Sequence, residues 1–162
     1  MFDPVRICEI LNEERVQYVV IGGIASVMHG SSLTTRDLDL VPARDDDNLA
    51  SLARALRRIH AKLRTGSEPV EFPIDATFLG RSEFSLSLVS DFGDLDLAFA
   101  PSGPLIGYED WAANARAMQM REGLTVLVGS LDAIIDSKRA AGREKDIAAL
   151  PLLESLREHL TE

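Results

Sequence analysis

The chain has 162 residues and a formal net charge of −9 at neutral pH, with 46% hydrophobic and 27% charged residues. These values are ordinary for one globular domain, and the acidic excess opposes binding of a nucleic acid over a broad surface, because such binding draws its affinity from lysines and arginines. A single cysteine, Cys8, excludes an intramolecular disulfide and a thiolate metal cluster, and its place on an apolar helical face predicts buried packing.

The distribution of apolar and charged residues also bears on where the protein acts. The longest apolar runs are a few residues, whereas a membrane span needs about 18. The first residues, MFDPVRICEILNEE, carry acidic groups where a signal peptide has basic and then apolar ones. We therefore expect a cytoplasmic protein.

The first half of the sequence predicts an alternation of helices and strands. Asp3 as N-cap and Pro4 at the first helical position begin a helix that ends near Glu14. The expected elements that follow are a strand at 18–21, a short helix from Gly22-Gly23 to about Gly30, a strand at 37–41 and an amphipathic helix at about 46–64. The glycine pair thus lies where a strand turns into a helix.

The second half combines a hairpin with a helical end. The expected elements are a loop at 65–75, a hairpin of strands 84–89 and 94–99, a proline- and glycine-rich loop at 101–107, a helix at 109–117, a strand at 124–128, a helix from the cap Ser130 to Gly142, and a helix at 143–160 that Pro151 kinks or restarts. No repeat or linker interrupts the pattern. We expect one α/β (α+β) domain over 1–162, a mixed β-sheet flanked by helices, with a C-terminal helical segment at 130–162.

Acidic side chains alternate with leucines in the strand at 37–41. Side chains two positions apart on a strand share a face about 6.5 to 7 Å apart, so Asp37 and Asp39 converge while leucines fill the core beneath. Such carboxylates repel each other, and a divalent cation that prefers oxygen ligands, such as Mg²⁺, removes that cost. Asp94 and Asp96 repeat the pattern; if the two strands are neighbours, three carboxylates can hold two ions about 4 Å apart. The alternative is a strand with a solvated acidic face.

The glycine pair points to a phosphate next to these carboxylates. A strand that ends at Gly22-Gly23 and begins a helix leaves free backbone N–H groups, and the missing side chains let a phosphate approach closely. The 13 residues between Gly23 and Asp37 suffice for one short helix and a return loop. A glycine cradle beside carboxylates predicts a nucleoside triphosphate site.

These motifs resemble those of a known superfamily. The glycine pair, a short helix and then the T-x-D-x-D of residues 35–39 resemble the signature of the nucleotidyltransferase superfamily, which has the DNA polymerase β-like fold. The stretches FGDLDLAFAPSG and SLDAIIDSKRAAGREKDIAALPLL are similar to the minimal nucleotidyltransferases of bacterial toxin–antitoxin and abortive-infection systems. The resemblance covers roughly residues 18–153 and implies a nucleotidyltransferase fold.

The resemblance implies roles for the matching residues. Asp37 and Asp39 would be metal ligands, and Asp96 the third acidic residue, with Asp94 as its rival. The implied contacts to the triphosphate are Gly22, Gly23, Thr35 and Lys138. The second-tier candidates are Arg36, Arg143, Lys145 and Asp146.

Two of these assignments leave alternatives open. Asp146 could bind metal, orient Lys138 or only cap a helix. Lys138 and its neighbour Arg139 could instead only provide favourable charge near the helix end at Gly142.

Among other candidate residues, His29 beside Gly30 fits a histidine that bonds a carbonyl at a helix end, with substrate contact as the alternative. Trp111, Met118 and Met120 are expected in the core or at a partner surface, and a histidine-based metal site is not expected.

Together the residues and the resemblance predict an Mg²⁺-dependent nucleotidyltransferase. It would use two ions and move a nucleoside monophosphate from a nucleoside triphosphate to an acceptor hydroxyl, releasing pyrophosphate. The resemblance favours a tRNA 3′ end as acceptor, a toxin role and a cognate antitoxin protein as partner. With a net charge of −9, an RNA would dock at a small basic spot around Arg36, Lys138, Arg139 and Arg143. The alternatives are transfer to an aminoglycoside or a protein hydroxyl, and a non-catalytic antitoxin or binding protein of the same fold.

Overall fold

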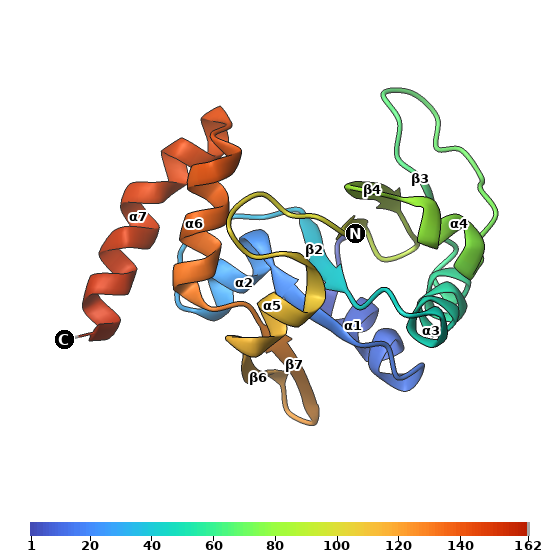
Figure 1. Cartoon of the computed structure of the whole chain (residues 1–162), viewed down its shortest axis with the longest axis horizontal. Helices are drawn as coiled ribbons and strands as arrows, with labels where there is room; N and C mark the ends of the chain where they lie inside the picture. The colour runs from blue at the N-terminus through green and yellow to red at the C-terminus, as the bar shows by residue number, and fades with distance from the viewer. Residues whose placement is uncertain (162) are drawn as a thin grey trace.

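The computed structural model describes residues 1–161 as a mixed sheet with helices packed around it (Figure 1). The strands are β1 (Tyr18–Ile21), β2 (Asp37–Pro42), β3 (Lys62–Leu63), β4 (Ser85–Val89), β5 (Asp94–Ala98), β6 (Arg116–Arg121) and β7 (Leu124–Val128). The helices are α1 (Pro4–Glu13), α2 (Gly22–Met28), α3 (Asp46–Arg58), α4 (Ala76–Arg81), α5 (Gly107–Ala113), α6 (Leu131–Ala141) and α7 (Glu144–Thr161). The expected α/β class with a mixed sheet is confirmed.

The seven strands follow the order β3-β4-β5-β2-β1-β7-β6 across the sheet. β2 pairs antiparallel with β1 and parallel with β5, and β1 pairs parallel with β7. The predicted hairpin is confirmed as the antiparallel pair of β4 and β5. β2 and β5, the two strands with the Asp-Leu-Asp-Leu pattern, are therefore direct neighbours near the middle of the sheet.

Side-chain caps fix where several helices begin, as the sequence predicts. Asp3 accepts a hydrogen bond from the backbone N–H of Arg6 at 3.0 Å and begins α1, and Ser130 accepts one from Ala133 at 3.1 Å and begins α6. Such a cap contributes about 1 kcal/mol, because it satisfies a backbone donor that has no partner within the helix. The Ser130 cap therefore fixes the start of α6, the helix that carries Lys138.

The core lies beneath the two acidic strands. Leu38 and Leu40 of β2 and Leu95 and Leu97 of β5 are fully buried, each worth roughly 1.5 to 3 kcal/mol. Cys8 is also fully buried, as its apolar neighbours predict. Within the described residues no helix has the length and apolar character to cross a membrane.

The helices at the two ends of the molecule flank the sheet (Figure 1). α6 and α7 pack side by side at one end, and α3 packs on α4 at the other. α2 and α5 pack on the central strands β1 and β2 between these ends. The helical segment expected at 130–162 corresponds to α6 and α7 over the described residues, and α7 continues through Pro151 instead of restarting there.

Two predicted helix ends are wrong. The helix expected to 64 ends at Arg58, because His60 adopts a left-handed backbone (φ 54°) that turns the chain into β3. The helix expected at 109–117 ends at Ala113, and the residues after it form β6, which was not predicted. Pairing with β7 overrides the helical preference of the alanines there. The short helix α4 was not predicted either.

Candidate active site

The register of β2 and β5 brings the acidic residues together. Asp37 lies opposite Asp94 and Asp39 opposite Asp96, so all four side chains share one face of the sheet. Oxygen atoms of Asp37, Asp39 and Asp96 lie within 4.8 Å of one another, and we call these three residues the carboxylate cluster. Asp94 is outside the cluster and forms an ion pair with Arg64 at 3.3 Å.

The carboxylate cluster is electrostatically costly. Burial, followed by the charges of Asp37 and Asp96, raises the pKa of Asp39 to about 7. Burial and the nearby Asp96 also raise the pKa of Asp37. Three converging carboxylates offer the hard oxygen ligands that Mg²⁺ prefers, and a cation would relieve their repulsion. The donor set therefore fits one or more divalent cations.

The glycine pair lies directly against this cluster. Gly22 has φ +69°, and a Cβ placed there would lie 2.1 Å from Oδ2 of Asp39. A Cβ on Gly23 would lie 2.6 Å from Oγ1 of Thr35, whose hydroxyl donates to the Asp37 carbonyl at 3.2 Å. The absent side chains thus make room for Asp39 and Thr35, in addition to any room they leave for a phosphate.

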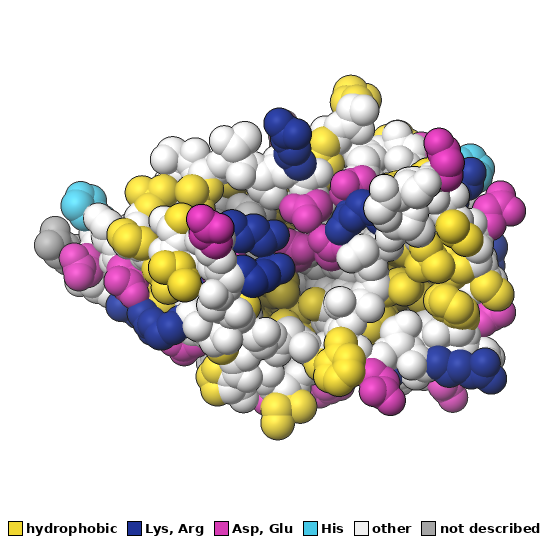
Figure 2. All heavy atoms as spheres, turned by 90° about the horizontal axis from the view of Figure 1, so that it is seen from above, with side chains coloured by type: hydrophobic (Ala, Val, Ile, Leu, Met, Phe, Trp, Pro, Cys, Tyr) yellow, Lys and Arg dark blue, Asp and Glu magenta, His cyan; other side chains and the backbone are white. Residues whose placement is uncertain are grey.

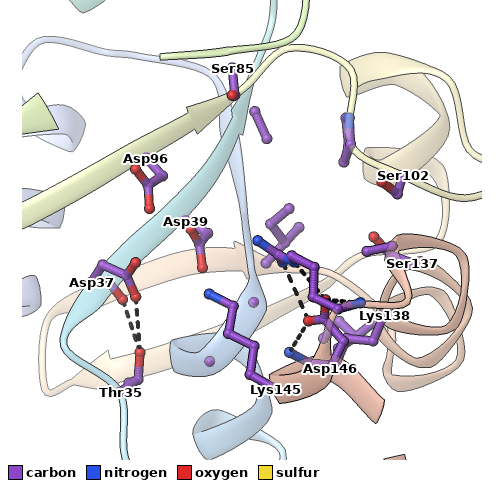
Figure 3. A pocket seen from close by; sticks show the side chains of 18 of the residues that line it. Thr35, Asp37, Asp39, Ser85, Asp96, Ser102, Ser137, Lys138, Lys145 and Asp146 are labelled. Carbon is purple, nitrogen blue, oxygen red and sulfur yellow. Dashed lines mark hydrogen bonds and ion pairs between the residues drawn. The ribbon is translucent and has the colours of Figure 1, made fainter. Parts of the chain in front are cut away.

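Basic residues from the α6–α7 junction face the cluster. Lys138 Nζ lies 3.7 Å from Oδ1 of Asp146, and Arg143 Nε lies 2.6 Å from Oδ2 of the same carboxylate. The charge of Lys145 opposes, without cancelling, the rise in the pKa values of Asp37 and Asp39. In Figure 3 its side chain extends toward these two aspartates, while Lys138 and Asp146 face each other. Three positive charges therefore line this side of the site.

Asp146 lies outside the carboxylate cluster and is 1% exposed. Burial raises its pKa, but the hydrogen bond from Arg143 and the charges of Arg143 and Lys138 outweigh burial and lower it overall. Its Oδ2 also accepts from the backbone N–H of Arg143, the residue before α7, at 3.3 Å. Of the three roles left open by the sequence, the contacts match orienting Lys138 and capping a helix.

A cleft of about 970 Å³ connects the carboxylate cluster with these basic residues. Figure 2 shows acidic side chains gathered in the hollow of this face, with basic side chains on both sides. Eleven of the residues predicted from the sequence line this cleft: Gly22, Gly23, Thr35, Arg36, Asp37, Asp39, Asp96, Lys138, Arg143, Lys145 and Asp146. Asp94 and Arg139 are not among the residues that line it, and Arg139 pairs with Glu154 instead. Arg36 is exposed.

The remaining candidates have structural contacts. His29 Nε2 bonds a carbonyl at 2.8 Å, as expected, but it is that of Gly129 after β7 rather than one in its own helix. Trp111 is 1% exposed, as expected of a core residue, and it is one of the residues that line the cleft. Among the described residues its Nε1 has no hydrogen-bond partner. Met118 and Met120 are half-buried on β6.

Arg64 is a charged residue of the site that was missed from the sequence. Arg64 contacts Asp96 with Nη2 at 2.6 Å and lies in the cleft wall. The prediction of a helix through residue 64 hid it, since Arg64 in fact follows the short strand β3 and is bonded to β4. The sequence could have pointed to Arg64 only as a basic side chain next to the acidic strands. Recognising that position requires the strand order, which the sequence does not provide.

The similarity of this chain to known proteins lies in its fold. No protein-family model matches the sequence, and no curated protein matches it. Solved structures do align with nearly the whole chain, among them the following three. A protein from Thermotoga maritima assigned as a nucleotidyltransferase covers 99% of this chain and 96% of its own, with 18% identity and a TM-score of 0.52.

Two antibiotic-related structures align somewhat better in space. The lincosamide antibiotic adenylyltransferase LnuA, bound to lincomycin, covers 94% of this chain and 95% of its own, with 16% identity and a TM-score of 0.63. ANT(2″)-Ia, in complex with adenylyl-2″-tobramycin, covers 96% and 93%, with 15% identity and a TM-score of 0.59. At these identities the similarity establishes the architecture, and the described chain has the fold of these nucleotidyltransferases.

Proposed function

We propose that this protein is a metal-dependent nucleotidyltransferase. The observation that carries the proposal is the carboxylate cluster facing Lys138, Arg143 and Lys145 across one cleft. A metal nucleoside triphosphate needs this combination, because oxygen ligands bind the cations and ammonium or guanidinium groups bind the phosphates. The fold similarity to nucleotidyltransferases over nearly the whole chain supports the same conclusion.

The residues of the cleft would have separate roles in binding the metal ions and the triphosphate. Asp37, Asp39 and Asp96 would hold the two Mg²⁺ ions, which supply charge neutralisation and acidify a bound hydroxyl. Lys138 and Lys145 would bind triphosphate oxygens, and Gly22 and Gly23 would let the phosphates approach the backbone. Arg143, Thr35 and Arg36 would add contacts at the edges of the same site.

The reaction would be a single displacement. The acceptor oxygen forms a bond to the α-phosphorus while the bond to the oxygen that bridges to the β-phosphorus breaks. Pyrophosphate leaves, and an oxygen of the carboxylate cluster takes the hydroxyl proton. No covalent enzyme intermediate is needed, so catalysis consists of positioning and charge stabilisation.

The wall of the cleft opposite Lys138, Arg143 and Lys145 favours a small hydroxyl-bearing molecule as the acceptor. This wall carries Ser85 and Ser87 of β4, Ala98 of β5 and the exposed Phe84, and its one basic residue, Arg64, is already paired with Asp94 and Asp96. Neutral hydroxyls and an aromatic ring suit a small polyol or a cationic antibiotic, and the net charge of −9 favours a cation. Two of the structural neighbours hold an antibiotic or an adenylylated one.

A tRNA 3′ end is the second candidate acceptor. Arg36 is exposed on the cleft and supplies a basic spot of the kind that an RNA would need on an acidic protein. A toxin role with a cognate antitoxin would accompany this acceptor and stays a prediction from the sequence.

A labelling experiment tests the activity and separates the acceptors. The purified protein is incubated with Mg²⁺ and each α-labelled nucleoside triphosphate, in parallel with total tRNA, an aminoglycoside panel and a lincosamide. We expect label on a small acceptor, release of pyrophosphate, and loss of both with Asp37→Asn. Label on tRNA would select the second candidate. If no triphosphate is consumed with any acceptor although wild-type protein binds metal and triphosphate, the protein is a binding protein of this fold.

A further inference from the structure

We infer that Arg64 is a positioning residue for the carboxylate cluster and that Asp94 holds Arg64 in place. On this assignment the two aspartates of β5 have different roles, with Asp96 as a metal ligand and Asp94 as the anchor of the arginine that orients it. The inference rests on the proposed function, because the ligand role of Asp96 does.

Four contacts fix Arg64 beside the cluster. Its backbone N–H donates to the Ser87 carbonyl at 2.9 Å, which attaches the residue to β4 just after β3. Its guanidinium donates to the Leu88 carbonyl at 3.3 Å and pairs with Asp94 at 3.3 Å and with Asp96 at 2.6 Å. The side chain is 29% exposed, so these bonds are partly shielded from water. The planar guanidinium therefore has one defined orientation, over β4 and toward β5.

This orientation constrains Asp96. Arg64 binds Oδ1 of Asp96, and among residues 1–161 no group donates a hydrogen bond to Oδ2. Repulsion from Asp37 and Asp39 would otherwise turn the Asp96 carboxylate away from the cluster. A short charge-assisted bond to Arg64 opposes this rotation and keeps Asp96 ready to bind a cation.

A simple counterion would behave differently from a positioning residue. If Arg64 only neutralises negative charge, its removal makes the cluster more negative, and a divalent cation binds more tightly. If Arg64 positions Asp96, its removal frees the third ligand, and the cation binds more weakly. Metal affinity measured without substrate therefore distinguishes the two roles.

The test is a titration of the full chain with Mn²⁺, followed by the electron paramagnetic resonance of the free ion. We expect Arg64→Ala to weaken Mn²⁺ binding about 10-fold or more, as removal of groups that orient metal ligands typically does. Arg64→Lys should fall between Arg64→Ala and wild type, since one ammonium cannot replace a planar fork on two carboxylates. Arg54→Ala, which removes an exposed arginine of α3 that pairs with Glu14, is the matched control and should bind Mn²⁺ like wild type.

The role of Asp94 is tested by a double-mutant cycle. Asp94→Asn should weaken Mn²⁺ binding less than Arg64→Ala does, and Arg64→Ala/Asp94→Asn should bind no more weakly than Arg64→Ala alone, because Asp94 acts through Arg64. Additive losses in the double variant would overturn the anchor role. In turnover assays the Arg64→Ala defect should appear in kcat at saturating metal and triphosphate.

The outcomes separate this inference from the proposed function. Mn²⁺ binding that is unchanged or tighter in Arg64→Ala overturns the positioning role, provided Asp37→Asn still abolishes binding. If Asp37→Asn also binds Mn²⁺ like wild type, the carboxylate cluster is not a metal site and the proposed function fails with it. Arg64→Gln, which keeps a hydrogen-bond donor and the side-chain stem, replaces Arg64→Ala if circular dichroism shows that Arg64→Ala is unfolded.

Discussion

Asp39 lies opposite Asp96 in the parallel register of β2 and β5, so two carboxylates from distant parts of the chain share one face of the sheet. Burial and this like-charged neighbourhood raise the pKa of Asp39 to about 7. The fold therefore holds an acidic group in a place where its charge is unfavourable unless a cation is bound. Proteins tolerate such a cost mainly at functional sites.

We expect Asp39→Asn to stabilise the metal-free protein, and more so at pH 8 than at pH 5. The pKa of Asp39 is raised from 3.8 in the unfolded chain to about 7 in the fold. Its contribution to stability is therefore fully present below pH 3.8 and is lost as the pH rises through about 7. Asparagine carries no charge and avoids this loss. Thermal unfolding in EDTA at the two pH values measures the difference.

Magnesium should reverse this comparison. With Mg²⁺ at pH 8 the wild type should gain thermal stability and the Asp39→Asn variant should gain little, because binding to the native state stabilises it. A variant whose advantage in EDTA is the same at pH 5 and pH 8 would show that Asp39 does not titrate in this range.

Gly22→Ala should damage both the fold and the metal site. A Cβ at Gly22 would lie 2.1 Å from Oδ2 of Asp39, and the backbone has φ +69°. We expect a loss of about 1 to 3 kcal/mol in the free energy of unfolding, from backbone strain and the displaced carboxylate. Gly66→Ala is the matched control, because nothing lies within 4 Å of its Cβ position. Urea unfolding and Mn²⁺ binding are the measurements, and equal behaviour of the two variants would contradict the contact.

Much of the site could be predicted because local patterns specify it. The alternation around Asp37 and Asp39 fixes which side chains face the core, and the glycine pair marks the strand-to-helix turn. The choice between Asp94 and Asp96 could not be made from local pattern, since both lie on the same face of β5. Only the register, which pairs Asp39 with Asp96, and the ion pair of Arg64 with Asp94 distinguish them.

The two strands that were not predicted, β3 and β6, lie at the edges of the sheet. β3 has two residues and β6 shows mostly exposed side chains, so neither has a clear apolar alternation. Each of these strands follows a helix that was predicted to be too long. The first helix ends at the left-handed turn of His60, and the second gives way to the strand that pairs with β7. Edge strands of this kind are selected by their neighbours rather than by their own residues.

Asp146→Asn should weaken triphosphate binding more than it slows the chemical step. The Asp146 carboxylate holds both Lys138 and Arg143, and neutralising it frees two basic side chains that face the cleft. We expect a higher KM for the triphosphate, with kcat changed less, and a stability loss of about 1 to 3 kcal/mol because the residue is buried. Asp132→Asn on α6 is the control, since Asp132 is 75% exposed and pairs with Arg157. A normal KM in Asp146→Asn would leave Asp146 with its capping role alone.

Lys138→Ala separates a chemical role from a structural one. Lys138 lies in the last turn of α6, where a positive charge favours the helix, but its side chain is only 18% exposed and lies against Asp146 in the cleft. If it only complements the helix end, its loss should cost about 0.3 to 1 kcal/mol of stability and leave turnover unchanged. If its ammonium stabilises charge on the triphosphate in the transition state, turnover should fall about 100-fold or more, or about 2.7 kcal/mol.

Arg139→Ala provides the matched control for this comparison. Arg139 lies next to Lys138 in the same turn, but it is 54% exposed and pairs with Glu154. Both variants remove one positive charge from the same helix end, so the helix effect should be similar in the two. We expect single-turnover rates at saturating triphosphate to fall only in Lys138→Ala, with Lys138→Arg restoring little, because a planar guanidinium does not replace a compact ammonium. Wild-type rates in Lys138→Ala would remove this residue from the site and leave Lys145 and Arg143 as the phosphate contacts.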